Sequence, residues 1–159
     1  SQLKSYEGKS IKKTITLTTE NQLLTKSDMD LTKAVLDLDL KKMTAGKYTF
    51  MLKNALGEKL VFGIDNTAKE LFIDRSQSGK TGFGNHYATP ITKAPLNKAF
   101  ANAKMKLLID KTSIEIFFND GEKVLTEIFF PNENFSELTL ATDTQTGTLK
   151  MNAHELLTK

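Results

Sequence analysis

The chain of 159 residues contains no cysteine, no tryptophan and only three prolines. The absence of cysteine excludes disulfides, thiolate metal sites and cysteine nucleophiles. No run of about 18 apolar residues is present, so the sequence predicts no membrane-spanning helix. The first ten residues, SQLKSYEGKS, lack the pattern of a signal peptide. Because they also lack an initiator methionine, we expect a processed protein or a piece cut from a longer one.

The chain also lacks a large excess of positive or negative charge. The formal net charge is +3, from 22 basic and 19 acidic residues, and it is spread along the chain. Electrostatic capture of nucleic acid is therefore not expected. The length predicts a single domain over residues 1–159 that buries about 68–70% of its unfolded surface. Lysine supplies every cation except Arg75, whose planar guanidinium suits carboxylates and hydroxyls better than an ammonium does.

Alternation of apolar and polar residues predicts strands along most of the chain, for example over residues 48–52, 60–64 and 114–118. Asn119-Asp120-Gly121 then predicts a hairpin, because a type I′ turn needs positive φ at both central positions. The return strand is expected over residues 123–130. We expect about ten to twelve short strands and no long helix. This pattern predicts an all-β fold, a concanavalin-like or jelly-roll-like β-sandwich of two antiparallel sheets.

Two segments fit the pattern less well. Residues 27–40 fit either a helix or a strand, and we expect a strand because the surrounding architecture is β. Residues 76–103 begin rich in glycine and contain Pro90 and Pro95. Connections longer than about 12–15 residues are usually functional or mobile. We expect this segment to cross from one sheet to the other and to cover one end of the sandwich.

The short motifs that suggest a cofactor or a metal site each lack residues that such a site needs. Gly79-Lys80-Thr81 resembles the end of a phosphate-binding loop, but Asp74 stands where that motif needs its first glycine. The two histidines, His86 and His154, are too isolated for a zinc site. Asp143–Gly147 lacks most carboxylates of a calcium loop. We therefore expect no cofactor and no metal.

The segments Leu71–Gly79 and Leu107–Pro131 each place an Asp, a basic residue and a hydroxyl residue after an apolar strand. Two carboxylates can hydrolyse a glycosidic bond. Four carboxylates would converge if the two strands are neighbours: Asp74, Asp110, Glu115 and Asp120. In the alternative, Asp74 and Asp110 cap the turns that follow them. Glu115 lies in mid-strand, on the side opposite the apolar residues, and there it either faces solvent or contacts a ligand.

The two segments carry the pattern Asp-Arg-x-x-Ser-Gly followed by ID[RK]xSxExFxNDGxxVxTxxxFP. This pattern resembles the C-terminal β-sandwich domain of glycoside hydrolase family 32, which contains levanases, inulinases, invertases and other fructosidases. The resemblance is strongest over residues 68–131, and Lys111 stands where the family usually has arginine. The matching residues are Asp74, Arg75, Ser78, Gly79, Asp110, Ser113, Glu115, Phe117, Asn119, Asp120, Gly121, Val124, Thr126 and Pro131.

The resemblance implies that catalysis belongs to another part of the polypeptide. In the family, an Asp nucleophile and a Glu acid/base perform a retaining hydrolysis from an N-terminal five-bladed propeller. Their motifs resemble WMNDPNG, RDP and EC, whereas this chain has no tryptophan, no cysteine and no Arg-Asp-Pro. We therefore expect no catalytic residues in this chain and a propeller of the same polypeptide as its partner. Because polymeric fructans do not enter cells, the resemblance also implies an extracellular or periplasmic protein.

Two classes of function follow from the resemblance. In the first, which we favour, the sandwich is a structural accessory that packs against the propeller. In the second, it is a fructan-binding module similar to carbohydrate-binding module family 66, which recognises terminal fructosyl units. Asp74, Arg75 and Glu115 would then bind fructosyl hydroxyls by charge-assisted hydrogen bonds, with Phe117 or Tyr87 against the ring. A lectin-like sandwich outside the family is a further alternative.

Overall fold

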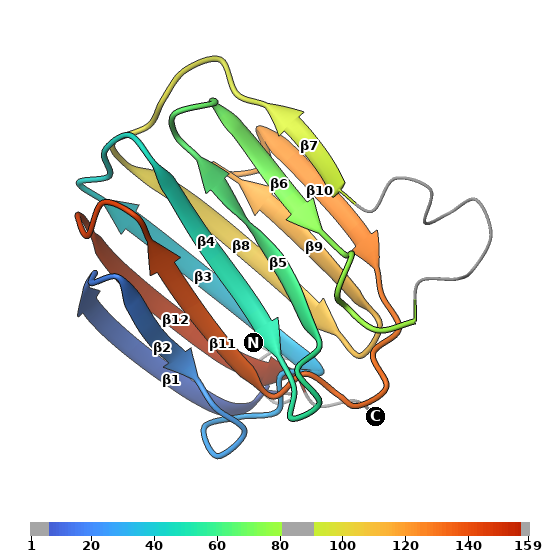
Figure 1. The fold of residues 1–159 in the computed structure, drawn as a ribbon. Coiled ribbons are helices and arrows are strands. Elements are labelled where there is room, and N and C mark those ends of the chain that lie inside the picture. The colour runs from blue at the N-terminus through green and yellow to red at the C-terminus, as the bar shows by residue number, and fades with distance from the viewer. Residues whose placement is uncertain (1–6, 81–90, 157–159) are drawn as a thin grey trace.

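The computed structural model describes residues 7–80 and 91–156, which form two six-stranded antiparallel sheets (Figure 1). We call sheet A the sheet with strand order β1-β12-β3-β8-β9-β10, and sheet B the one with order β2-β11-β4-β5-β6-β7. The strands are β1 (Glu7–Thr16), β2 (Glu20–Leu24), β3 (Lys33–Lys41), β4 (Lys47–Lys53), β5 (Lys59–Asp65), β6 (Glu70–Asp74), β7 (Ile91–Pro95), β8 (Ala103–Asp110), β9 (Ser113–Phe118), β10 (Lys123–Ile128), β11 (Glu137–Thr142) and β12 (Thr148–Leu156).

The predicted all-β sandwich is confirmed. The two sheets lie face to face, with sheet B in front of sheet A in Figure 1. Twelve strands agree with the expected ten to twelve, and the described residues contain no helix. These residues accordingly include no helix long and apolar enough to cross a membrane.

The core lies between the sheets, where alternate side chains of each strand point inward. Phe50 of β4 stacks on Phe62 of β5, with the ring centroids 5.3 Å apart. Phe118 of β9 meets Phe100 edge to face at 5.2 Å. The alternation predicted for residues 114–118 is confirmed, since its three apolar members on the inner side are buried. Glu115 and Phe117 consequently point to the outer face of sheet A.

The predicted hairpin between β9 and β10 is confirmed. Asn119, Asp120 and Gly121 have φ values of 46°, 59° and 90°, so the turn holds its residues in the left-handed region that such hairpins require. The return strand ends at Ile128, earlier than the predicted end at Phe130.

The two ambiguous segments form strands in part. The strand expected over residues 27–40 starts at Lys33, and the residues before it form turns that bury Met29 and Leu31. The segment 76–103 does lead from sheet B to sheet A, but it first forms β7, which pairs with β6 in sheet B. The sequence did not predict β7, because this edge strand is only partly buried and lacks an apolar stripe. Residues 81–90, which include Tyr87, lie outside the described residues.

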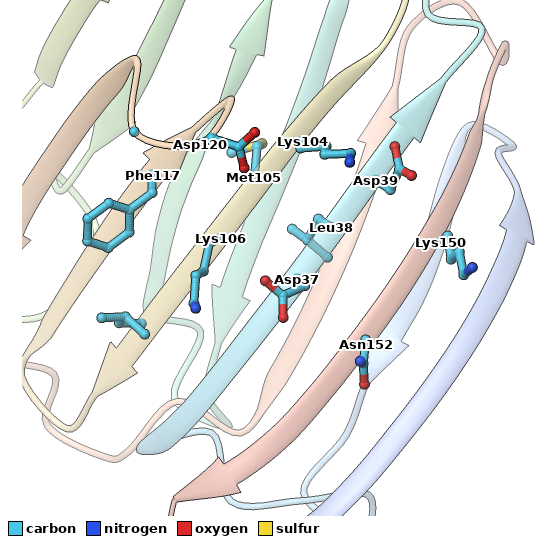
Figure 2. Close-up of a pocket in the computed structure, with 12 residues that line it drawn as sticks. Asp37, Leu38, Asp39, Lys104, Met105, Lys106, Phe117, Asp120, Lys150 and Asn152 are labelled. Carbon is cyan, nitrogen blue, oxygen red and sulfur yellow. The ribbon is translucent and has the colours of Figure 1, made fainter. Parts of the chain in front are cut away.

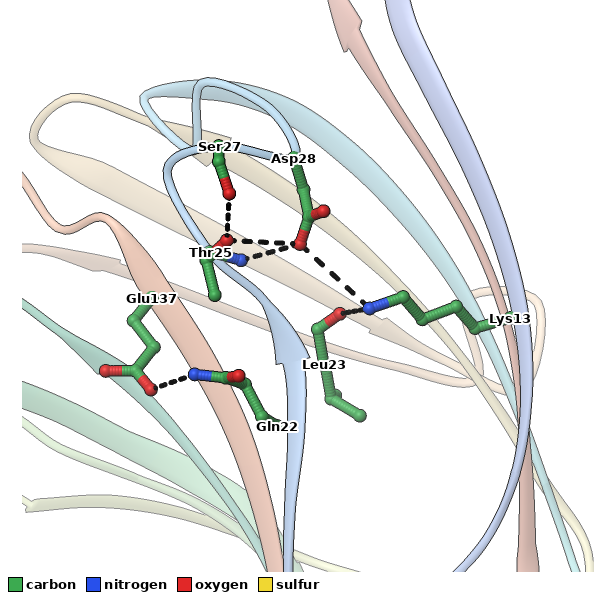
Figure 3. Close-up of polar contacts among 7 residues, drawn as sticks. All are labelled: Lys13, Gln22, Leu23, Thr25, Ser27, Asp28 and Glu137. Atoms are coloured by element: carbon green, nitrogen blue, oxygen red, sulfur yellow. Dashed lines mark hydrogen bonds and ion pairs between the residues drawn. The ribbon is translucent and has the colours of Figure 1, made fainter.

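Lys13 connects the sheets at the edge formed by β1 and β2 (Figure 3). It lies on the core side of β1, opposite the buried Met151, and its Nζ donates a hydrogen bond of 2.6 Å to the carbonyl of Leu23 in β2. The same Nζ is 4.0 Å from a carboxylate oxygen of Asp28. An inward-pointing charge on an edge strand opposes pairing with another chain. Lys13 therefore both joins the two sheets and protects the edge.

Glu58 holds the loop that follows β10 against the turn before β5. Its Oε1 accepts hydrogen bonds from Asn54 Nδ2 at 2.9 Å and from the backbone N–H of Asn132 at 2.8 Å. Its Oε2 accepts a third from Asn132 Nδ2 at 2.6 Å. These bonds, first that from Asn54 and then those from Asn132, hold the pKa of Glu58 below its ordinary value.

We expect Glu58→Gln to weaken the dependence of stability on acid pH. A carboxyl whose pKa is lower in the folded state stabilises that state above its unfolded pKa of about 4.3, and this contribution is lost as the pH falls through the folded value. Urea unfolding between pH 7 and pH 3 measures it, and the loss at pH 7 is about 1 kcal/mol. Glu122→Gln, at an exposed turn residue without a side-chain bond in the described part of the chain, is the control. An equal effect of both variants would contradict the assignment.

Candidate functional site

The guanidinium of Arg75 reaches from sheet B to sheet A. Arg75 directly follows β6 and is only 5% exposed. Its Nη1 donates a hydrogen bond of 3.2 Å to the carbonyl of Ile128, at the end of β10. The same nitrogen lies 3.2 Å from Oε2 of Glu127 and forms an ion pair with it. The single arginine of the chain thus connects the two sheets at the edge opposite Lys13.

Glu127 completes this connection. It lies on the core side of β10, in phase with the buried Leu125, and its other carboxylate oxygen accepts a short hydrogen bond from the hydroxyl of Thr92 in β7. We call Arg75, Glu127 and Thr92 the edge cluster. Glu127 is not among the residues predicted from the sequence, and the available signal for it is a glutamate in the inward phase of a strand. A buried carboxylate needs a cationic partner, and Arg75 is the only arginine.

Asp74 shapes the turn that carries Arg75. Its Oδ1 accepts a hydrogen bond of 2.9 Å from the backbone N–H of Ser76, which is the bond that the turn-capping interpretation predicts. Ser78 is fully buried, and its hydroxyl donates to the carbonyl of Arg75 at 2.8 Å. These bonds fix the direction in which the arginine side chain leaves the turn.

The residues predicted to bind sugar lie in different parts of the sandwich. Asp74 and Arg75 belong to the end of β6 in sheet B, whereas Glu115 and Phe117 lie on the outer face of β9 in sheet A. Tyr87 lies outside the described residues. Glu115 and Phe117 share one face of one strand, so the structure brings these two together. Sugar binding by any of the five stays a prediction.

A groove of about 760 Å³ crosses the outer face of sheet A (Figure 2). It runs over β9, β8, β3 and β12, which are consecutive neighbours in the sheet. We call it the sheet A groove, and its lining residues are Asp37, Leu38, Asp39, Lys104, Met105, Lys106, Leu108, Phe117, Asp120, Gly121, Lys150 and Asn152.

The central row of the sheet A groove combines an amide, a carboxylate, an ammonium and an aromatic ring. Asn152 of β12 lies opposite Asp37 of β3. Asp37 in turn lies opposite Lys106 of β8, and Lys106 lies opposite Phe117 of β9. Directly opposite residues on one face have Cβ atoms about 4.5–5.5 Å apart, so these four side chains form a continuous row.

A second row runs beside the first and is charged throughout. Asp39 of β3 has Lys150 of β12 opposite it on one side and Lys104 of β8 on the other. Asp120, from the left-handed turn between β9 and β10, adds a carboxylate at one end of the groove. Asp120 and Phe117 are candidate residues from the sequence, whereas the groove residues on β3, β8 and β12 are not. Their proximity depends on strand order, which local patterns do not reveal.

The expected absence of a metal stays a prediction. In residues 7–80 and 91–156, no group of three or more His, Cys, Asp or Glu side chains has an arrangement suited to a metal ion. Such sites need several oxygen or nitrogen ligands directed at one point. Asp37 and Asp39 lie two residues apart on β3, and the lysines of β8 lie between them and Asp120.

The protein is a two-sheet antiparallel β-sandwich domain that carries two polar sites, the edge cluster and the sheet A groove. A sequence profile for the family described as "Glycosyl hydrolases family 32 C terminal" matches residues 2–155. The chain therefore belongs to this family, and the family resemblance drawn from its sequence motifs is confirmed.

Curated relatives and solved structures agree with the family. A levanase from Bacillus sp. (strain L7) is 33% identical over 88 residues, which cover 55% of this chain and 9% of the levanase. A sucrose-6-phosphate hydrolase from Staphylococcus xylosus is 27% identical over 126 residues, or 75% of this chain and 23% of the relative. The exo-inulinase structure from Aspergillus awamori superposes with a TM-score of 0.79 at 22% identity, over 98% of this chain and 31% of that chain. The chain thus spans less than a quarter of the two curated relatives.

Proposed function

We propose that this domain is the non-catalytic accessory sandwich of a glycoside hydrolase that degrades fructans or sucrose. The observation that carries the proposal is the extent of the match: a C-terminal family profile covers residues 2–155, while the chain spans only 9% of a protein named levanase. In this proposal the sandwich packs against the catalytic propeller of the same polypeptide and stabilises it.

Two features of the chain favour the role of a non-catalytic accessory domain. The sequence lacks the tryptophan, the cysteine and the Arg-Asp-Pro that the family's catalytic motifs contain. Apolar side chains are also exposed near the edge cluster: Val124 and Ile128 on the outer side of β10 are 49% and 45% exposed, and Ile91 at the start of β7 is 43% exposed. Val124 and Ile128 share the outer face of β10, and exposed apolar residues on one face favour contact with another protein surface. The location of the parent protein outside the cell stays a prediction.

The test compares the complete parent polypeptide with a version that lacks residues 1–159. We expect the complete protein to hydrolyse levan, inulin or sucrose, and the truncated protein to unfold several degrees lower in a thermal scan and to aggregate. The isolated domain should release no reducing sugar from any of the three. Hydrolysis by the isolated domain, or unchanged melting of the truncated protein, would overturn the proposal.

A further inference from the structure

We propose that the sheet A groove binds a neutral oligosaccharide that lies across the strands, as a stretch of several sugar units. The location of this site is independent of the structural role proposed above. Its assignment to fructan oligosaccharides rests on that proposed function. The groove also differs from the terminal-sugar site predicted from the sequence, since of the four predicted residues that the structure describes only Phe117 lines it.

The charges of the sheet A groove favour a neutral ligand. Three carboxylates and three ammonium groups line it, and acidic and basic side chains alternate across the strands. The carboxylates are those of Asp37, Asp39 and Asp120, and the ammonium groups are those of Lys104, Lys106 and Lys150. A polyanion or a polycation that crosses the strands would meet charges of its own sign on every second strand. Sugar hydroxyls, in contrast, both donate to carboxylates and accept from ammonium groups.

The composition of the groove disfavours a protein partner. The buried centre of a protein–protein interface is depleted in Lys, Glu and Asp, because such a partner must strip water from them without replacing every bond. The centre of the sheet A groove consists largely of Lys and Asp. A polyhydroxyl ligand replaces those bonds with its own hydroxyls.

The polar groups of the central row are available to a ligand. In the part of the chain that the structure describes, the side chains of Asp37, Lys106 and Asn152 form no hydrogen bond or ion pair with the protein. Figure 2 shows Asp37 and Lys106 on neighbouring strands, with Phe117 beyond the lysine. The central row thus presents a carboxylate that accepts hydrogen bonds, an ammonium that donates them and an amide that does both, and these three groups do not bond to one another.

Phe117 supplies the apolar part of the groove. Its side chain points outward from β9 and is only half-buried. The face of an aromatic ring carries a negative quadrupole, which attracts the slightly positive C–H groups on the apolar face of a sugar. A ring at one end and hydroxyl-binding groups along the floor together match a sugar chain, which has both kinds of surface.

The dimensions of the groove exceed those of a single sugar ring. The four strands β9, β8, β3 and β12 span three inter-strand spacings of about 4.8 Å, or about 14 Å. The volume of about 760 Å³ lies within the range of about 300–1,000 Å³ that small-ligand sites occupy. An oligosaccharide therefore fills the groove better than fructose does.

An NMR titration of residues 1–159 with levan and inulin oligosaccharides, fructose and malto-oligosaccharides tests the inference. We expect saturable shifts at Asp37, Lys106 and Phe117 with a fructan oligosaccharide, and weaker binding of fructose. Phe117→Ala should weaken binding about tenfold, and Asp37→Asn about fivefold. The matched controls, Leu56→Ala and Glu133→Gln, change exposed residues away from the groove and should leave the affinity unchanged.

The possible outcomes separate this inference from the proposed function. Groove shifts with malto-oligosaccharides but not with fructans would support the oligosaccharide site and count against a fructan-degrading parent. Shifts confined to the turn around Asp74 and Arg75, or no shifts with any sugar at millimolar concentration, would overturn the groove site. Concentration-dependent broadening of groove signals without sugar would also overturn it, since it would indicate a contact between copies of the chain.

Discussion

Replacing Glu127 with alanine is expected to lower the free energy of unfolding by about 3 kcal/mol. The substitution removes the carboxylate that faces the guanidinium of Arg75, and the side chains of the two residues are only 14% and 6% exposed. Removal of one partner from a buried ion pair typically costs about 3–5 kcal/mol, because the remaining charge loses its partner without regaining water. We take the lower end because Glu127 retains some exposure. The hydroxyl of Thr92 loses its acceptor at the same time.

Urea unfolding of single and double variants measures this effect. The double variant Arg75→Met/Glu127→Leu should recover most of the lost stability, since apolar residues of similar volume often replace a buried ion pair at little cost. A double-mutant cycle then isolates the coupling between the two residues. Glu115→Ala, on the outer face of sheet A, is the control and should change stability by less than about 0.5 kcal/mol. If Glu127→Ala is no worse than Glu115→Ala, the edge cluster does not hold the sheets together.

Gly79→Ala is expected to destabilise the domain by about 2–4 kcal/mol. Gly79 has φ of +125°, a conformation that L side chains rarely adopt, so strain alone costs about 1–3 kcal/mol. A Cβ would also overlap the carbonyl oxygen of Phe130 and come within 2.5 Å of Cα of Pro131. These are backbone atoms, and they can move away only if the turn after β6 separates from the chain after β10. Lys80 donates a backbone hydrogen bond of 2.9 Å to Phe130 across this contact.

A second glycine distinguishes strain from steric overlap. Gly57 has φ of +83°, but nothing lies within 4 Å of the Cβ that alanine would introduce there. Gly57→Ala should therefore cost only the conformational strain. Chemical denaturation of both variants gives the difference, which contains the steric overlap at Gly79 together with any difference in strain between φ of +125° and +83°. Equal losses would show that the turn after β6 moves freely relative to Phe130 and Pro131.

Local patterns in the sequence were sufficient to predict most of the strands, β7 being an exception, but not which strands are neighbours in a sheet. The alternation over residues 114–118 and the Asn-Asp-Gly turn depend on contacts between residues close in sequence, and both are confirmed. The pairing of β12 with β3 and of β3 with β8 depends on the way the whole chain folds back on itself. The row from Asn152 to Phe117 follows from that strand order, so the sheet A groove was not predictable from spacing.

The partner of Arg75 in the edge cluster was also not predictable from the sequence, for a different reason. Arg75 was recognised as unusual because it is the only arginine, and a carboxylate or hydroxyl partner was expected. The carboxylate is supplied by Glu127, more than fifty residues along the chain and in the other sheet. Both a ligand and the protein itself can satisfy a guanidinium, and the residues around Arg75 in the sequence do not distinguish the two. The inward phase of Glu127 in β10 was the one local indication, and it becomes clear only once the inner side of that strand is known.

The strand order also has a consequence for the time course of folding. Among the described strands, β1 pairs with β12 alone, and the residues that meet, such as Ile15 and Leu149, are separated by most of the chain. A ribosome adds about 5–20 residues per second, so β1 waits several seconds after its synthesis before its partner exists. Pairings between such distant segments also close slowly, because the entropy of the intervening loop is lost before any contact compensates for it. During that interval Ile11 and Ile15 lack the strand that pairs with theirs in the folded domain, so this edge is open to misassembly until β12 has been synthesised.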